Sequence, residues 1–199
     1  VEVQRRHGKL TFAEVLEPAI YYASEGFPVS EIIAQQWRAA VPVLSQFPAS
    51  AQTYLIDGKA PQAGDVHRQP NLARTLQLLA SEGKEAFYRG DIARRIVQFS
   101  QMTGGFLSLE DFASHTTEWV EPLRTDYRGY SVLELPPNGQ GITALMALNV
   151  LEGFNVGAME YGSAAYYHLL IEATKQAFAD RNRYIADPAY ATIPVAGLL

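Results

Sequence analysis

Residues 127–153, YRGYSVLELPPNGQGITALMALNVLEG, contain the stretch that decides the fold. The run Tyr130–Leu135 alternates in the manner of a strand, and Ala144–Leu151 is apolar enough for a buried helix. Between them, Leu135–Thr143 (LPPNGQGIT) forms a turn that contains two glycines. A glycine-containing turn between a strand and a helix often holds a phosphate or an oxyanion. This turn could therefore bind an anion or simply bend the chain.

The residues of the turn favour the structural interpretation. A phosphate loop requires GxxxxGK[ST], and a dinucleotide fingerprint requires GxGxxG. The turn supplies Gly139 and Gly141, but it has neither the lysine nor a third glycine at the required spacing. We therefore interpret it as a bend.

A β-hairpin is expected just before the turn. Strand-like runs at Glu118–Asp126 and Tyr130–Leu135 are joined by the tripeptide YRG, which suits a tight connection. The helix that follows the turn is expected to end at Gly153.

The N-terminal half shows mainly helical signals. Thr11 and Glu14 have the spacing of a capping box, Pro18 is expected to divide the helix in two, and Gly26 is expected to end the second part. Ser30 is expected to cap a helix that stops or kinks at Pro42.

The region from Gln46 to Pro70 is expected to consist of loops, with residues 53–56 (TYLI) as a possible short strand. Three further helices are expected after it. They are PNLARTLQLLASEG from Pro70, DIARRIVQFSQM capped by Asp91, and a short turn whose capping box is Ser108 with Asp111.

The last long helix is expected over Ala164–Asp187. Its apolar stripe contains Tyr166, Leu169, Leu170, Ala173, Ala177 and Tyr184. Asp180 and Arg181 lie on or beside this stripe, so they are expected to need partners or to line a site. The fold class is therefore mainly α with a small β component.

Composition excludes several classes of function. The chain has 199 residues, 48% of them apolar, a net charge of −5 and no basic run, so it lacks the footprint of a nucleic-acid-binding protein. The absence of cysteine excludes disulfides, thiolate catalysis and sulfur-based zinc sites. No apolar run approaches the roughly 18 residues of a membrane span. Both ends are expected to continue into a longer protein.

Side chains with catalytic potential do not form a complete site in the sequence. The histidines His7, His67, His115 and His168 are far apart, and only His168 with Glu172 has a helical metal-ligand spacing. In His115-Thr116-Thr117 the neighbouring side chains point to opposite faces of a strand. We therefore assign no catalytic residue, no metal site and no cofactor.

Seven segments in order resemble the large subunit of the gamma-glutamyltransferase family, which also contains cephalosporin-acylase-like relatives. The similarity extends from about Leu10 to Pro194. The segments are EPAIYYASEGFPVS, QPNLARTLQLLASEG, AFYRGDIARRIV, GGFLSLEDFASH, YRGYSVLELPP, GITALMALNVLEGFN and YYHLLIEATKQAFADRNRYIADP.

The resemblance implies that residues 1–199 form one segment of the large subunit. Residues 1–115 would be the helical part, and residues 116–199 the hairpin with two long helices. The whole protein would be an αββα N-terminal-nucleophile hydrolase that cuts itself before a threonine. That threonine would then cleave γ-glutamyl amides such as glutathione and pass the acyl group to water, an amino acid or a peptide.

The family's key residues do not transfer to this chain. The nucleophilic threonine is expected after Leu199, and the arginine that holds the substrate's carboxylate is expected upstream of Leu10, in a context that Arg5 and Arg6 lack. The substrate-binding residues in this chain are therefore unknown, and the chain alone is expected to be inactive. Its expected partners are the small-subunit portion of the same precursor and a small γ-glutamyl substrate.

Two alternatives remain open: a cephalosporin or glutaryl acylase relative, and a non-catalytic helical binding module. Asn138 and Gln140 stand where the transferases usually have a serine-bearing turn, which leaves the substrate class open. Asp180 and Arg181 match the family and are interpreted as a charge pair that joins the last helix to its neighbours. Only the resemblance suggests a periplasmic or extracellular location. Exposed apolar surface is expected, because the chain would lack its partner subunit.

Overall fold

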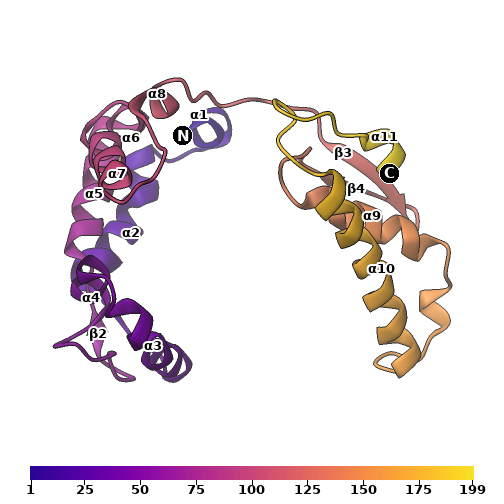
Figure 1. Ribbon diagram of the computed structural model, residues 1–199, viewed down its shortest axis with the longest axis horizontal. Helices are drawn as coiled ribbons and strands as arrows, with labels where there is room; N and C mark the ends of the chain where they lie inside the picture. Colours follow the sequence, from indigo (N-terminus) through magenta and orange to yellow (C-terminus); the bar gives the residue numbers. More distant parts are fainter. The chain divides into compact units, whose positions relative to one another are not determined.

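The computed structural model describes all 199 residues and divides into two compact units, Val1–Thr117 and Glu118–Leu199. The first unit runs from indigo to magenta in Figure 1, and the second continues to yellow. The first unit is helical except for one short antiparallel ribbon, whereas the second combines a β-hairpin with two long helices.

The first unit contains eight helices and two short strands. They are α1 (Glu2–His7), α2 (Phe12–Glu25), β1 (Phe27–Pro28), α3 (Glu31–Leu44), α4 (Pro48–Tyr54), β2 (Val66–His67), α5 (Pro70–Glu82), α6 (Lys84–Tyr88), α7 (Asp91–Met102) and α8 (Leu109–Ala113). The two strands pair antiparallel, with Phe27 opposite His67. The helices α2 and α5 pack against each other, as do α6 and α7.

Two helices continue through prolines that were expected to interrupt them. The helix α2 contains Pro18 and α3 contains Pro42, and both prolines are exposed. The carbonyls that lose an intrahelical donor belong to Glu14 and Arg38, which are also exposed, so water can satisfy them. The predicted break at Pro18 and the predicted stop at Pro42 are therefore wrong.

The predicted loop from Gln46 to Pro70 is wrong over α4. Pro48 occupies the first turn of this helix, where a missing backbone N–H costs no hydrogen bond. The possible strand at residues 53–56 is also wrong. Its first two residues belong to α4, and only Ile56 pairs, in an isolated bridge with Lys59.

The predicted caps have mixed outcomes. Both capping boxes are confirmed: Thr11 N–H donates to Glu14 Oε2 at 2.7 Å, and Ser108 N–H donates to Asp111 Oδ2 at 2.7 Å. Ser30 occupies the N-cap of α3, but its side chain makes no capping hydrogen bond. Asp91 is the first residue of α7 and not its cap, because Gly90 holds the N-cap position.

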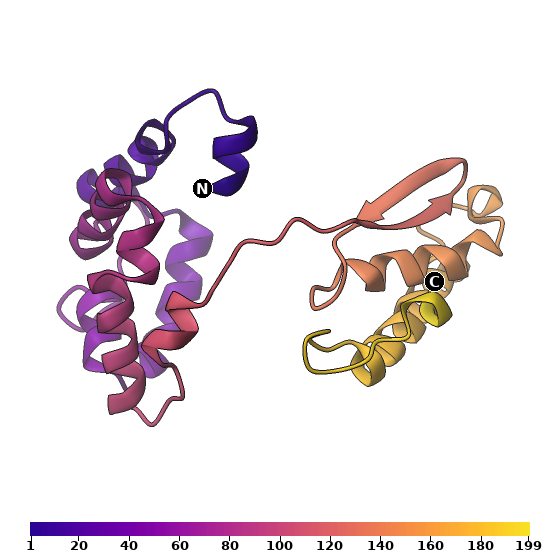
Figure 2. The same ribbon diagram turned by 90° about the horizontal axis from the view of Figure 1, so that it is seen from above.

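The second unit contains the predicted hairpin, turn and helices, which Figure 2 shows from above. Its elements are β3 (Leu123–Tyr127), β4 (Tyr130–Glu134), α9 (Gly141–Glu152), the 3₁₀ turn η1 (Val156–Ala158), α10 (Ala164–Tyr184) and α11 (Val195–Leu198). The strands are antiparallel, with Leu123 opposite Glu134 and Tyr127 opposite Tyr130. The first strand begins later than predicted, just after Pro122, which cannot donate to the ladder.

The core of the second unit lies between α9 and α10. Ile142, Met146 and Ala177 form a buried cluster, and Leu123 of β3 packs against it. The apolar stripe predicted for α10 is confirmed, with Ala173 and Ala177 buried at its centre. This core fixes the start of α9 and therefore the turn that precedes it.

Apolar side chains are also exposed in both units, as expected. Phe106 and Tyr190 are 99% and 90% exposed, and Ile32 is 69% exposed. None of the helices in residues 1–199 combines the length and hydropathy needed to cross a membrane.

Candidate functional site

The turn at residues 135–140 joins β4 to α9 and is the first candidate site. Pro137 is buried, whereas Asn138, Gly139 and Gln140 are exposed. The backbone N–H of Thr143 donates to Gln140 O at 3.0 Å, which tightens the first turn of the helix. The turn is therefore anchored at both ends and presents its polar residues to solvent.

A carboxylate of the protein itself lies at the start of α9. A Cβ placed on Gly141 would lie 2.5 Å from Glu134 Oε2 and 2.8 Å from Glu134 Cβ, so the two residues are in close contact. The N-terminus of a helix carries partial positive charge and favours a negative group. Because Glu134 already places a carboxylate beside it, the geometry opposes a phosphate at this turn.

Beneath the turn lies a buried hydroxyl with no partner. Thr143 is 5% exposed, and its Oγ1 is buried without a hydrogen-bond partner. Buried polar atoms are normally paired. This feature has no local signal in the sequence, because burial of residue 143 depends on how α9 packs.

A groove of about 610 Å³ adjoins the turn. One wall is Pro136 and Pro137, and the other is the segment from Pro188 to Ile193. Asp187 holds that segment in place, since its Oδ1 accepts from Ala189 N–H at 2.9 Å and its carbonyl accepts from Tyr190 N–H at 3.0 Å. The groove is a concave surface whose one ionisable side chain is the phenol of Tyr190. It can therefore hold a molecule or a chain segment in place, but it contains no nucleophile paired with a general base.

The four histidines lie on separate elements and are not brought together. His115 stacks on Tyr88, with ring centroids 4.9 Å apart and planes 14° apart. Thr116 and Thr117 beside it are exposed, in an extended segment. Neither threonine is hydrogen-bonded to an imidazole, so this tripeptide is not a nucleophile–base pair.

His67 is the one buried histidine. It is 5% exposed, its ring lies 4.7 Å from that of Trp37 between centroids, and Tyr54 stacks on it. Burial lowers the pKa of His67 below its usual value of 6.5. This packing gives it a structural role in the first unit.

The predicted metal-ligand spacing on the last helix does not assemble a site. His168 is exposed, and the carboxylate of Glu172 pairs instead with Lys175 at 2.7 Å. No group of three or more potential ligands gathers anywhere in residues 1–199.

The charge pair expected at Asp180 and Arg181 is not present. Asp180 is exposed and makes no ion pair in the described chain, while Arg181 donates to Asn182 Oδ1 at 2.8 Å. Asp180 is therefore not on the buried face of α10.

The N-terminal arginine Arg5, which lacks the family's carboxylate-binding context, pairs with Glu2 of the same helix at 3.0 Å.

Comparison with known proteins gives consistent matches along the whole chain. The family model for gamma-glutamyltranspeptidase matches residues 1–199. The glutathione hydrolase-like YwrD proenzyme of Bacillus subtilis (strain 168) is 44% identical over 99% of this chain. The acylase ACY 1 proenzyme of Pseudomonas sp. (strain SE83) is 38% identical over 100% of it.

The chain is shorter than these relatives. It covers 38% of the YwrD proenzyme and 36% of acylase ACY 1, and 33% of the 34%-identical glutathione hydrolase proenzyme of Escherichia coli (strain K12). The chain thus spans about a third of the length of these curated relatives.

Solved structures agree with the sequence matches. The cephalosporin acylase from Bacillus halodurans has a TM-score of 0.89 and 40% identity, over 100% of this chain and 38% of that one. The gamma-glutamyltranspeptidase of Helicobacter pylori has a TM-score of 0.89 and 29% identity, over 99% of this chain and 57% of that one. The likeness of this chain to both structures supports the mainly helical fold class.

Proposed function

This chain belongs to the gamma-glutamyltranspeptidase family, and from that premise we propose that it forms part of a proenzyme that cleaves γ-glutamyl amides such as glutathione. The acyl group would pass to water, an amino acid or a peptide. The observation that carries the proposal is the 44% identity to a glutathione hydrolase-like proenzyme over 99% of the chain.

Within the proposed enzyme, this chain supplies scaffold and both walls of the groove beside the turn. In residues 1–199, the threonine hydroxyls next to His115 have no base, and the arginines near the N-terminus lie on α1, far in sequence from the groove at Pro136 and Pro137. We assign the nucleophile to a threonine elsewhere in the precursor. Its own α-amino group would act as the base, which is one established way to activate a weak hydroxyl.

The experiment uses the full-length protein. We expect a denaturing gel to show two bands, and γ-glutamyl-p-nitroanilide to release p-nitroaniline in proportion to enzyme. Replacing the threonine at the new N-terminus by alanine should abolish both, while leaving the thermal melt intact. A single band without turnover from a folded protein would refute the proposal and favour a non-catalytic binding module.

A second candidate is a glutaryl or cephalosporin acylase. It is favoured by the 40% identity to a cephalosporin acylase structure and by the turn with Asn138 and Gln140, which differs from the serine-bearing turn that the resemblance implies for the transferases. Glutaryl-p-nitroanilide lacks only the α-amino group of the γ-glutamyl substrate. A kcat/KM for the glutaryl compound above that for the γ-glutamyl compound would select the acylase.

A further inference from the structure

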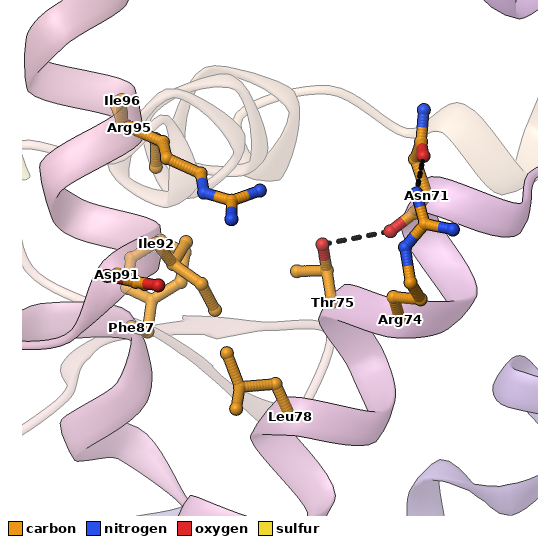
Figure 3. Close-up of a pocket in the computed structure, with 9 residues that line it drawn as sticks. All are labelled: Asn71, Arg74, Thr75, Leu78, Phe87, Asp91, Ile92, Arg95 and Ile96. Carbon is orange, nitrogen blue, oxygen red and sulfur yellow. Dashed lines mark hydrogen bonds between the residues drawn. The ribbon is translucent and has the colours of Figure 1, made fainter.

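A groove of about 530 Å³ lies between α5 and α7 in the first unit, well away in sequence from the turn at residues 135–140 (Figure 3). Its floor is apolar and comprises Leu78 of α5, Phe87 of α6, and Ile92 and Ile96 of α7. A volume of this size is typical of pockets for small molecules, which fall at about 300–1,000 Å³. The floor can therefore hold the apolar body of a ligand.

The rim of this groove carries a positive charge that closes no ion pair, although its field helps to lower the pKa of Asp91. Arg95 makes no hydrogen bond and no ion pair in the described chain, and Figure 3 shows its guanidinium directed across the groove toward the α5 side. Its sequence neighbour Arg94 differs, because it pairs with Asp91 at 2.5 Å. The two adjacent arginines thus have different roles, one closing a local ion pair and the other facing the groove.

The charges around the groove favour a single anionic group. Arg74 on the opposite side donates to the side-chain oxygen of Asn71, and its guanidinium adds a second positive charge at the rim. The one carboxylate there, Asp91, is already paired with Arg94, and its pKa is lowered chiefly by the hydrogen bond from that residue. A multiply charged anion would be repelled by Asp91 and would leave the apolar floor unused.

We propose that this groove binds a small amphipathic carboxylate, with its head group on Arg95 and its apolar body over Leu78, Phe87, Ile92 and Ile96. A guanidinium presents two parallel N–H donors that match the two oxygens of a carboxylate. The floor contributes by removing the apolar body from water. This site goes beyond the proposed hydrolase activity, because no residue of the groove belongs to the turn or to its adjoining groove.

The test is isothermal titration calorimetry on the full-length protein with 4-phenylbutyrate as the probe. Its neutral counterpart, 4-phenylbutan-1-ol, has the same apolar body without the charge. We expect the carboxylate to bind more tightly than the alcohol. Arg95→Gln should weaken binding of the carboxylate by about fivefold, which is the range that exposed charge pairs allow. The same substitution should leave the affinity for the alcohol unchanged.

A second variant is expected to change the affinity for 4-phenylbutyrate in the opposite direction. Asp91→Asn removes the negative charge at the rim, frees Arg94, and should strengthen binding of 4-phenylbutyrate. Arg124→Gln changes an exposed arginine of the other unit, which pairs only with Asp126, and serves as the matched control. Equal binding of the acid and the alcohol, or equal effects of Arg95→Gln and Arg124→Gln, would overturn the proposal, as would weaker binding in Asp91→Asn.

Discussion

Glu134 at the end of β4 lies so close to Gly141 at the start of α9 that a side chain on Gly141 would overlap it. An added Cβ would meet Glu134 Oε2 at 2.5 Å, Cβ at 2.8 Å and Cδ at 3.0 Å. The first of these atoms can rotate away, but Glu134 Cβ is fixed by the strand. The contact thus links the hairpin to the helix through the turn.

Gly141→Ala is therefore expected to destabilise the second unit by about 1–3 kcal/mol, the usual cost of overpacking. Thermal unfolding of the 199-residue chain, followed by circular dichroism, measures the change. Gly139→Ala is the matched control, two residues away in the same turn, because nothing lies within 4 Å of its added Cβ. Equal melting temperatures for the two variants would show that the contact with Glu134 does not constrain the turn.

The hairpin between β3 and β4 depends on two residues with positive φ. Arg128 has φ of 52° and Gly129 has φ of 81°, and nothing lies within 4 Å of a Cβ added at Gly129. Gly129→Ala should therefore cost about 1–2 kcal/mol through backbone conformation alone. Asparagine tolerates this region better, so Gly129→Asn should recover part of the loss in the same unfolding experiment. Equal losses in both variants would contradict a purely backbone origin.

The hairpin and its turn could be predicted because their signals are local. Alternation over Tyr130–Leu135, the glycine in YRG and the apolar run after residue 141 each specify the structure of their own segment. The capping boxes at Thr11 and Ser108 are equally local, since the two side chains of each box are three residues apart. These elements were found in the structure, although the first strand of the hairpin begins later than predicted.

The errors arose where the outcome depends on which side of a helix faces solvent. Pro18 and Pro42 were expected to interrupt helices, but both are exposed, and water can satisfy the carbonyls that lose a donor. Asp180 was expected on or beside the buried face of α10 with a charged partner, but the helix exposes it to solvent. Sequence spacing gives the periodicity of a helix but not the partner that buries it.

The groove between α5 and α7 was missed for a related reason. Arg74 and Arg95 are 21 residues apart, and only the packing of α5, α6 and α7 brings them to one rim. A signal was present in the sequence, because Ile92 lies three residues before Arg95 and four before Ile96, which are helical spacings. It could not be interpreted without knowing that the facing helix also presents an arginine.

Stability of the first unit should fall in mild acid because of His67. Its folded-state pKa is lowered by burial, so the unfolded chain binds the proton more tightly and is favoured as the pH falls below about 6.5. Urea unfolding at pH 7.5 and 5.5, followed by fluorescence in a Trp119→Phe background, where Trp37 is the one remaining tryptophan, should show a lower midpoint at the lower pH. The carboxylates with lowered pKa values, such as Asp111, lose their contribution only at more acidic pH.

The variant His67→Gln removes this titration and should flatten the difference between the two pH values, whatever its effect on the absolute stability. His168→Gln changes an exposed histidine of the other unit and should leave the Trp37 transition unchanged at both pH values. If His67→Gln retained the full pH dependence, the acid sensitivity would have to come from another group.

Thr143 provides the sharpest test of the interior of the second unit. It is 5% exposed, and its hydroxyl is buried without a partner, next in sequence to the fully buried Ile142. Valine has nearly the same shape and a similar helix propensity, but it has no polar atom to desolvate. Thr143→Val should therefore raise the free energy of unfolding by about 1 kcal/mol. Thr143→Ser keeps the hydroxyl and deletes a methyl group, so it should lower the free energy by about 1 kcal/mol. If valine were instead the more destabilising of the two, the hydroxyl would have to be hydrogen-bonded in solution, and the start of α9 would contain a bound polar group.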